Sequence, residues 1–335
     1  MRIPYEQLKN TFETILLKKG VETQAAKIAA ENFAQTSVDG IYSHGVNRFP
    51  RVVSYLEKGV IDGKAKPTCI NSFGSFERWD GHMGLGNVNA VIAMNRACEL
   101  AKQNGIGIVA IGNTNHWMRG GAFGWQAADN GCIGICWTNT MPNMPAWGGK
   151  QAKIGNNPFI ISIPRSNGAH IVIDCAMSQF AYGKIEMSRL KGEQLPVPGG
   201  WDTNGNFTTD PAEIEKTQRV LPIGYWKGSG LSIALDLAAA VLAGANTVTD
   251  IGRKYTDEVG LSQVMIAIDP TKMNTKDMTD SIINTVLDDI KTSEPASPGG
   301  KILYPGELEF ITREDNMKNG IPVLEEIWDS IVKML

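Results

Sequence analysis

The feature that most constrains the fold is an alternation of short apolar runs with helical patterns in the middle of the chain. The runs have the length of buried strands, and the apolar residues between about 88 and 103 recur at helical spacing. This alternation is typical of an α/β protein, in which helices cover the faces of a sheet. We predict helices at residues 88–103 and 122–129, extended structure at 69–79, and strands at 106–111, 133–137, 159–163, 171–174 and 264–269.

The glycine fingerprint of a Rossmann fold is missing from this alternation. That fingerprint places three glycines in a tight turn between a strand and a helix. Gly105-x-Gly107 lies between a helix and a strand, which is the wrong order. The two other Gly-x-Gly pairs, which begin at Gly84 and Gly228, lack the third glycine. A bound dinucleotide would therefore need another cradle.

One alternative cradle is the segment from Asp174 to Lys184, where an apolar strand ends in small and hydroxylic residues. Backbone amides at the start of a following helix could receive phosphate oxygens there. An ordinary strand-to-helix junction with Asp174 as the helix cap explains the pattern equally well. The residues alone leave both interpretations open.

The chain begins and ends in helical patterns. Three apolar stripes end at Gly20, at the Asp39-Gly40 turn and at Gly59, and Asn47 is the expected cap of the third helix. Two further helices close the chain. We predict an N-terminal helical segment at 1–65, a mixed-sheet core at 66–300, a surface excursion near 191–221 with a short helix after Asp210-Pro211, and a C-terminal segment at 301–335 that packs back on the N-terminal helices.

Two later segments carry specific expectations. The apolar residues from Leu231 to Leu242 lie all round a helix, which predicts burial on every side and would bring Lys227 into the core region. A lysine there needs an anionic partner such as a ligand phosphate, whereas a surface lysine needs none. Residues 302–307 are predicted to form an apolar strand that ends in a turn beside Glu307.

The composition indicates a globular protein with a small-molecule partner. The 335 residues are 42% hydrophobic and 20% charged, and a net charge of -3 gives no basic field for nucleic acid. The first residues lack the apolar run of a signal peptide and no later run reaches the length of a membrane span, so we expect a cytoplasmic protein. The five cysteines form no CxxC pair, so no metal site is expected and the thiols are predicted to be reduced and buried.

Two polar clusters carry the residues best suited to chemistry. His44 and Arg48 lie between two helical patterns, and His116 and Arg119 follow the apolar run at 106–111. A histidine can pass a proton near neutral pH and an arginine matches a carboxylate, so together they suit an acid substrate that bears a carbonyl. The alternatives are a solvated surface turn around His44 and a loop that merely packs around His116.

Six short motifs, in their order and spacing, resemble the type two malate/L-lactate dehydrogenase family over nearly the whole chain. They are Ser43-His44-Gly45, Asn115-His116, Gly155-x-Asn157-Pro158, Asp174 with Ser178 and Gly183, Lys227-Gly228-x-Gly230, and Pro305-Gly306. The resemblance implies an α/β fold with a non-Rossmann mixed-sheet nucleotide-binding domain and a helical domain formed from both chain ends. It also implies a homodimer that reduces a 2-oxo acid with NADH or, alternatively, NADPH.

The resemblance and the chemistry of the side chains together imply roles for individual residues. His44 is expected to be the proton donor, with a pKa near its ordinary value of roughly 6.5, and Arg48 is expected to hold the substrate carboxylate. Further substrate contacts are expected from Ser43, His116 and Arg119. The expected cofactor contacts are His170, Ile171, Val172, Ile173, Asp174, Cys175, Ala176, Trp226, Lys227, Gly306 and Glu307.

The identity of the substrate is left open at this point. A sugar acid, malate, lactate, ureidoglycolate and a cyclic imino acid all remain in question, because pocket-lining residues cannot be placed from the sequence. A sugar-acid binding protein or regulator without catalysis would also keep the Arg48 pocket. Only an enzyme needs a proton donor aimed at a carbonyl, so the presence of His44 favours catalysis.

Overall fold

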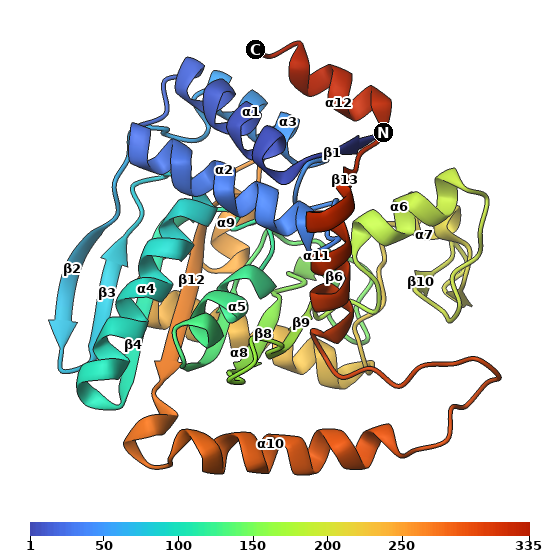
Figure 1. Cartoon of the computed structure of the whole chain (residues 1–335). Helices are drawn as coiled ribbons and strands as arrows, with labels where there is room; N and C mark the ends of the chain where they lie inside the picture. Colours follow the sequence, from blue (N-terminus) through green and yellow to red (C-terminus); the bar gives the residue numbers. More distant parts are fainter.

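The computed structural model describes residues 1–335 as an α/β fold built on one seven-stranded sheet (Figure 1). The helices are α1 (Tyr5–Lys18), α2 (Thr23–Val38), α3 (Phe49–Glu57), α4 (Gly86–Asn104), α5 (Gly121–Asp129), α6 (Tyr182–Leu190), α7 (Pro211–Thr217), α8 (Trp226–Ala243), α9 (Val248–Lys254), η1 (Pro270–Lys272), α10 (Lys276–Lys291), α11 (Glu307–Asn319) and α12 (Glu325–Val332). The strands are β1 (Arg2–Ile3), β2 (Thr68–Phe73), β3 (Phe76–Asp80), β4 (Ile106–Asn115), β5 (Ile133–Thr138), β6 (Met144–Pro145), β7 (Ala152–Ile154), β8 (Phe159–Ile163), β9 (Ile171–Cys175), β10 (Gly200–Trp201), β11 (Phe207–Thr208), β12 (Val259–Ile268) and β13 (Ile321–Pro322).

The large sheet has the strand order β2-β3-β4-β12-β5-β8-β9 and is antiparallel except for the β3–β4 pair. It follows that β3, β4, β5 and β9 run in one direction. Their carboxyl ends therefore meet the beginnings of β8 and β12 at one end of the sheet, which we call the site end. Helices α4 and α5 pack on one face and α8 packs on the other. The mixed, non-Rossmann sheet predicted from the sequence is confirmed.

Apolar side chains from the helices pack on both faces of this sheet. On the α4 face, Met94 is fully buried in one cluster with Val109 of β4 and Met265 of β12. On the opposite face, Leu235 of α8 packs in a second buried cluster with Val264. Because β12 contributes alternate residues to the two clusters, its central position holds both layers together. This rigid scaffold fixes the loops at the site end relative to one another.

Both chain ends belong to one helical unit beside the sheet. Phe12 stacks on Phe49 with ring centroids 4.1 Å apart, and Phe33 meets Phe49 edge-on at 5.3 Å. Trp328 and Ile331 of α12 lie in the same buried cluster, and β1 pairs with β13. Both termini lie next to these helices in Figure 1. The helical domain formed from both chain ends is confirmed, and the boundaries at residues 65 and 300 stay predictions.

Helix α8 departs from the expected burial on every side. Leu231, Ile233, Leu237 and Val241 are exposed, the last of them at 77%. The reason is that α8 covers one face of the sheet and carries no further layer on its outer side (Figure 1). Lys227 in its first turn is exposed as well. The prediction that Lys227 enters the core is therefore wrong, and the surface-lysine alternative describes it better.

By length and composition, α8 could also cross a membrane. This overturns the expectation that no apolar run in the chain is long enough. The sheet side of α8 nevertheless belongs to the buried cluster of Leu235 and Ala239. Trp137 Nε1 in β5 donates to Leu235 O at 3.0 Å. These contacts explain the apolar composition of α8 as that of a helix that covers a sheet.

Residues 302–307 form no strand, contrary to prediction. Pro305 has no N–H to donate, and the segment joins the edge strand β9 only where Val172 N donates to Pro305 O at 3.0 Å. Glu307 already begins α11. The segment is therefore a short connection that runs along the outer edge of β9.

Smaller boundaries also differ from the sequence-based expectations. The residue that caps α3 is Arg48 rather than Asn47, with proline in the first turn as expected. Strand β12 begins at Val259 rather than at residue 264, because its first half, which includes the polar Ser262 and Gln263, is buried inside the sheet instead of forming a loop. Cys69 is exposed and Cys175 is half-buried, so the predicted burial of all five thiols fails at these two residues.

The excursion near 191–221 is a small layer of its own. It contains α7 and the β10–β11 pair and projects from the body together with α6 (Figure 1). Ile185, Leu195, Ile214 and Val220 form a separate buried cluster in it. Asp210 caps α7 by accepting from Ala212 N at 2.8 Å, which confirms the predicted short helix.

Candidate active site

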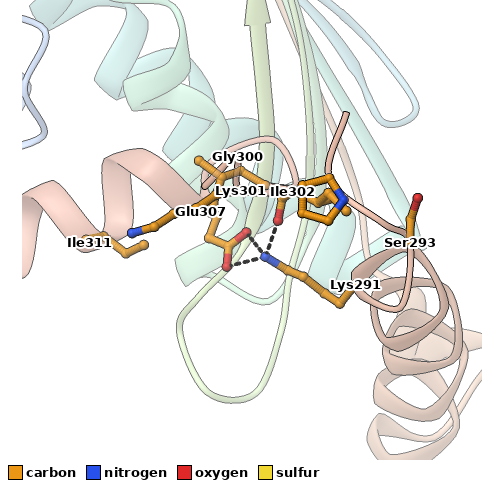
Figure 2. Close-up of a pocket in the computed structure, with 9 residues that line it drawn as sticks. Lys291, Ser293, Gly300, Lys301, Ile302, Glu307 and Ile311 are labelled. Atoms are coloured by element: carbon orange, nitrogen blue, oxygen red, sulfur yellow. Dashed lines mark hydrogen bonds and ion pairs between the residues drawn. The ribbon is translucent and has the colours of Figure 1, made fainter. Parts of the chain in front are cut away.

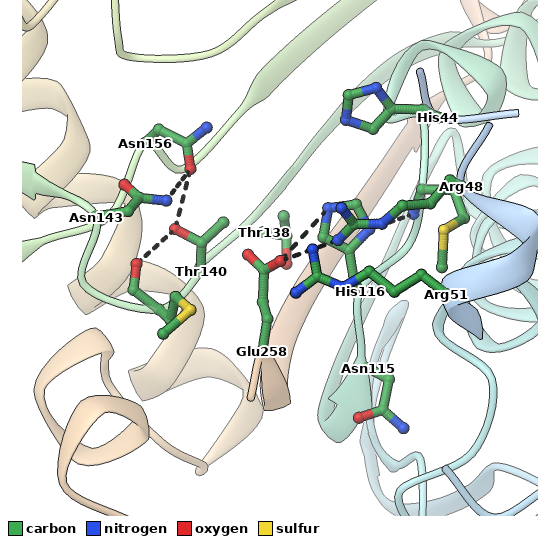
Figure 3. A network of polar contacts seen from close by, with 12 residues as sticks. His44, Arg48, Arg51, Asn115, His116, Thr138, Thr140, Asn143, Asn156 and Glu258 are labelled. Carbon is green, nitrogen blue, oxygen red and sulfur yellow. Dashed lines mark hydrogen bonds and ion pairs between the residues drawn. The ribbon is translucent and has the colours of Figure 1, made fainter. Parts of the chain in front are cut away.

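The two polar clusters predicted from the sequence come together at the site end of the sheet (Figure 3). His116 directly follows β4, whose last residue Asn115 pairs with Val259 at the start of β12. Glu258 therefore lies beside His116 (Figure 3), although 142 positions separate the two residues in the sequence. His44 reaches the same place from the turn between α2 and α3.

Close packing holds the His44 turn against α2. Ser37 Oγ in α2 accepts from Val46 N at 2.8 Å and donates to Phe33 O at 2.8 Å. A side chain at Gly45 would place its Cβ 2.3 Å from Ser37 Oγ, so only glycine allows this approach. Ser43 Oγ lies 3.0 Å from His44 Nδ1. The turn therefore presents His44 from a fixed backbone, not from a loose surface loop.

The position of His116 is also fixed by its neighbours. A Cβ at Gly86, the first residue of α4, would come within 2.0 Å of Asn115 O, so the helix packs directly on the backbone before His116. Met118 N donates to His116 Nδ1 at 2.9 Å. Since Nδ1 accepts this bond, a neutral His116 carries its proton on Nε2. The rings of His44 and His116 stack with centroids 5.9 Å apart and planes inclined by 23°.

Glu258 is the anionic group that faces these side chains. Its Oε2 lies 3.6 Å from Arg48 Nη2 and 3.8 Å from His116 Nε2. Figure 3 shows Arg51 on the same side of the carboxylate as Arg48. The site thus brings together Ser43, His44, Arg48 and His116, as the sequence predicted, and adds a carboxylate that the sequence analysis missed.

Burial and charge shift the pKa values of these groups. Burial, and after it the charges of Arg48 and Arg119, lowers the pKa of His44 to about 4. Burial, followed by the charge of Arg48, also lowers the pKa of His116. Both rings are therefore neutral at pH 7, and the expectation of an ordinary pKa for His44 is wrong. Burial raises the pKa of Glu258, while the charges of Arg48 and Arg51 oppose that shift.

The surroundings of Arg119 favour a structural role over the predicted substrate contact. Arg119 is buried and its Nη1 donates to the buried carboxylate of Asp39. Arg313 of α11 donates to the same carboxylate from Nε at 2.7 Å and from Nη2 at 3.1 Å. One carboxylate at the end of α2 therefore ties the loop before α5 to α11. Asp39 is a second important residue that the sequence analysis did not select.

Of the three predicted cofactor segments, the one from His170 to Ala176 contains β9, and the two others flank this strand. Residues 221–223 run beside 177–179, where Gln179 N donates to Leu221 O at 2.7 Å and Ile223 N donates to Met177 O at 2.8 Å. This pairing brings the start of α8, with Trp226 and Lys227, close to the carboxyl end of β9. Gly306 lies at the other half of β9, where a Cβ would come within 3.0 Å of His170 O and Val172 N.

Individual side chains of the segment 170–176 have different surroundings. His170 lies at the end of the sheet opposite the site end, where its Nε2 is 3.0 Å from Asp129 Oδ1 and it lines a pocket of about 430 Å³. Asp174 Oδ2 accepts from Gly121 N at 2.7 Å. It therefore caps α5 and not the following helix, which begins later, at Tyr182. The remaining predicted residues form β9 and its end: Ile171, Val172, Ile173, Cys175 and Ala176.

Glu307 lines a second open pocket, of about 400 Å³, on the outer side of this region (Figure 2). Lys291 Nζ donates to its two carboxylate oxygens at 2.7 and 2.5 Å and to Ile302 O at 2.6 Å. Tyr304 N donates to Glu307 Oε2 at 3.1 Å. These bonds fasten α10 to the connection before α11, which gives Glu307 a structural role beside the predicted cofactor contact.

The polar groups around the end of β9 fit a bound nucleotide. Ser178, three residues after the end of β9, is buried, and its Oγ has no hydrogen-bond partner within the protein. Asn143 Oδ1 is likewise buried and unpaired, while Asn143 Nδ2 donates to Asn156 Oδ1 at 2.8 Å. Buried polar atoms normally have partners. A ligand with several hydrogen-bonding groups would satisfy them at this place.

The fold resembles that of dehydrogenases of known structure, and the class of protein is therefore a dehydrogenase with a mixed, non-Rossmann sheet. The sulfolactate dehydrogenase of Methanocaldococcus jannaschii superposes with a TM-score of 0.90 at 32% identity, with 100% of this chain and 96% of that chain covered. The malate dehydrogenase of Entamoeba histolytica gives a TM-score of 0.95 at 25% identity, covering 100% and 97%.

The chain belongs to the malate/L-lactate dehydrogenase family, whose model matches residues 3–332. It is an oxidoreductase, and the family membership indicates a nicotinamide cofactor. The chain is 46% identical over 331 residues to a 2,3-diketo-L-gulonate reductase of Citrobacter koseri, with 99% of both chains covered. It is 46% identical over 332 residues to an enzyme of the same name from Escherichia coli, with the same coverage.

Proposed function

We propose that this protein reduces 2,3-diketo-L-gulonate to 3-dehydro-L-gulonate with NADH. The observation that carries the proposal is the arrangement of His44, Arg48 and His116 at the site end of the sheet. The full-length relatives at 46% identity that bear this reductase name support the choice of substrate. A sibling reaction on malate, L-lactate, ureidoglycolate or a cyclic imino acid is the alternative, because the same arrangement would serve any of these acids.

The proposed chemistry assigns one task to each side chain. Arg48 holds the substrate carboxylate through its planar guanidinium and so sets which face of the carbonyl is presented. When bound, the nicotinamide cofactor supplies the hydride. Negative charge grows on the carbonyl oxygen during this transfer. His44, which takes up a proton when the substrate carboxylate binds at Arg48, donates that proton to the oxygen. Ser43 orients the His44 ring through Nδ1, and His116 is a second polar contact for the substrate.

The cofactor is proposed to lie along β9, with its reactive end toward the carboxyl end of the strand. The residues proposed to hold it are the segment from His170 to Ala176, the pair Trp226-Lys227 and the pair Gly306-Glu307, with NADPH as the alternative to NADH. Five residues of β-strand extend over roughly 17 Å, which suits an extended dinucleotide. The unpaired Ser178 Oγ at this end supports the placement.

A panel of 2-oxo acids, each assayed by the loss of NADH absorbance, tests the proposal. We expect turnover with 2,3-diketo-L-gulonate that exceeds turnover with oxaloacetate, pyruvate and cyclic imino acids. Higher turnover with another acid of the panel would change the proposed substrate but not the proposed type of reaction. If no member is reduced while isothermal titration shows sugar-acid binding, the protein is a binding module and the enzymatic proposal fails.

Substitution of Arg48 separates substrate binding from the proton transfer. Arg48→Lys keeps a positive charge but loses the paired hydrogen bonds to a carboxylate. We therefore expect KM for the 2-oxo acid to rise roughly tenfold or more, on the scale of a lost charged hydrogen bond. Steady-state kinetics and NADH fluorescence titration measure the two affinities. A rise in KM for NADH alone would place Arg48 in the cofactor site instead.

We also propose a homodimer in the cytoplasm, on the resemblance to the family. The exposed apolar side chains Leu231, Ile233, Leu237 and Val241 of α8 support an association between copies. Sedimentation velocity at micromolar concentration should give about twice the mass of one chain. A monomer under these conditions would contradict the dimer but would leave the proposed reaction unaffected.

A further inference from the structure

Glu258 brings a negative charge into a site that is otherwise built to bind an acid. Its side chain is only 13% exposed. Glu258 directly precedes β12, which lies between β4, the strand before His116, and β5, which ends at Thr138. No part of the proposed reaction requires a second carboxylate there. A buried charge is unfavourable unless it is paired, so the presence of Glu258 calls for a physical explanation.

The distances around Glu258 argue against a role in fixing Arg48 and His116 by direct hydrogen bonds. Oε2 of Glu258 is 3.6 Å from Arg48 and 3.8 Å from His116, and both distances exceed those of direct hydrogen bonds. By contrast, the structural carboxylate of Asp39 is held by Arg313 at 2.7 Å. Glu258 therefore acts on the site mainly through its charge, and its nearest cation stays free to bind an incoming carboxylate.

In the free site, with Glu258 ionised, the charges of Arg48, Arg51 and Glu258 sum to one positive charge. The cations are Arg48 and Arg51, whose charges oppose the rise that burial causes in the pKa of Glu258. His44 and His116 are neutral, because burial and the nearby arginines lower the pKa of each ring. One excess positive charge matches one substrate carboxylate, and the proton that His44 takes up with the substrate is passed on to the carbonyl oxygen. A second substrate carboxylate would meet the negative charge of Glu258 in a poorly solvated space, where repulsion is strong.

We propose that Glu258 determines the charge class of the substrate: it admits 2-oxo acids with a single carboxylate and rejects those with two. The inference rests on the proposed 2-oxo acid reduction and narrows its substrate class to monocarboxylates, among which a diketo sugar acid falls. The Glu258 carboxylate also offers an acceptor for a hydroxyl group of such a sugar chain. Specificity arises here from a repulsive element, a device by which proteins reject wrong partners.

Two matched pairs of substrates test the proposal directly. 2-Oxobutyrate and oxaloacetate differ by a terminal methyl in place of a carboxylate, and 2-oxopentanoate and 2-oxoglutarate differ in the same way. The readout is the ratio of kcat/KM for the dicarboxylate to that for its monocarboxylate partner. In Glu258→Gln this ratio is expected to rise roughly 10- to 100-fold in both pairs, because a repulsive charge contact is removed. Glu258→Asp keeps the charge and should keep the wild-type ratio.

A matched control separates charge selection from damage to the fold. Glu77 of β3 is another buried carboxylate, and its Oε1 lies 2.7 Å from Nη2 of Arg96. Glu77→Gln should leave the substrate ratio unchanged, whatever it does to stability. If the wild-type protein reduces 2-oxo acids and Glu258→Gln leaves both ratios within twofold of wild type, the inference about Glu258 is wrong. If the wild type reduces no member of the panel, the proposed function itself has failed.

Discussion

His44→Asn is expected to lower kcat for the reduction by roughly 100-fold or more, the usual scale for a lost general acid. Asparagine keeps a polar side chain of similar reach, but it cannot donate a proton to the growing negative charge on the carbonyl oxygen. The affinity for NADH should stay within twofold of wild type, because the His44 turn lies between α2 and α3 and not on the proposed cofactor strand β9. Steady-state kinetics and NADH fluorescence titration measure the two effects.

The pH dependence provides a second readout of the same assignment. The pKa of His44 is lowered to about 4 by burial and by Arg48 and Arg119, so the free ring is neutral at pH 7 and is ready to act as the base in alcohol oxidation. A substrate carboxylate on Arg48 adds negative charge, which raises the pKa of His44 and couples substrate binding to proton uptake. We expect kcat for reduction to fall as pH rises through this raised pKa. The rate of alcohol oxidation should fall as pH falls through the pKa of His44 in the complex with the alcohol.

A control histidine is available outside the site. His82 is 47% exposed and accompanies Asp80 at the end of β3. His82→Asn should leave kcat and both pH profiles unchanged. Near-normal turnover of His44→Asn across the pH range would show that His44 is not the proton donor. In that case His116, whose ring stacks on His44, would be the next residue to replace.

Asp39→Ala is expected to destabilise the protein by about 3–5 kcal/mol, the range for removal of one partner from a buried ion pair. The carboxylate is 1% exposed and the Arg119 side chain 3% exposed. Its loss would leave the Arg119 guanidinium buried without an anion, and Arg313 would lose both of its bonds to Asp39. Urea unfolding followed by circular dichroism measures the change in the free energy of unfolding.

An exposed ion pair in the same helical unit supplies the comparison. Asp315 is 52% exposed and pairs with Arg2 at 3.2 Å. Asp315→Ala should change stability by only about 0–1 kcal/mol, as is usual for surface pairs. If Asp39→Ala proves no less stable than Asp315→Ala, the Asp39 cluster does not hold α2, the Arg119 loop and α11 together.

Local sequence patterns were sufficient to predict most of the framework. Helical spacing identified α1, α2 and α4, and apolar runs located β4, β5 and β8, because these patterns depend on neighbours a few residues apart. The spacing of glycines excluded a simple Rossmann half, and the mixed sheet agrees with that exclusion. The turn that carries His44 was also predictable, because Gly40 and Pro50 limit the helices on either side of it.

The sequence by itself thus determined most of the elements, an α/β fold without a simple Rossmann half, and the two polar clusters with His44, Arg48 and His116. Only the tertiary structure placed Glu258 beside them, since that contact depends on the pairing of β4 with β12. The same holds for Asp39, whose partners lie 80 and 274 residues away in the chain. The outer side of α8 is exposed because no further layer of the protein packs on it. The spacing of apolar residues within the helix does not predict this. Periodicity is a property of neighbouring residues, whereas a site is formed by residues that strand register and helix packing bring together.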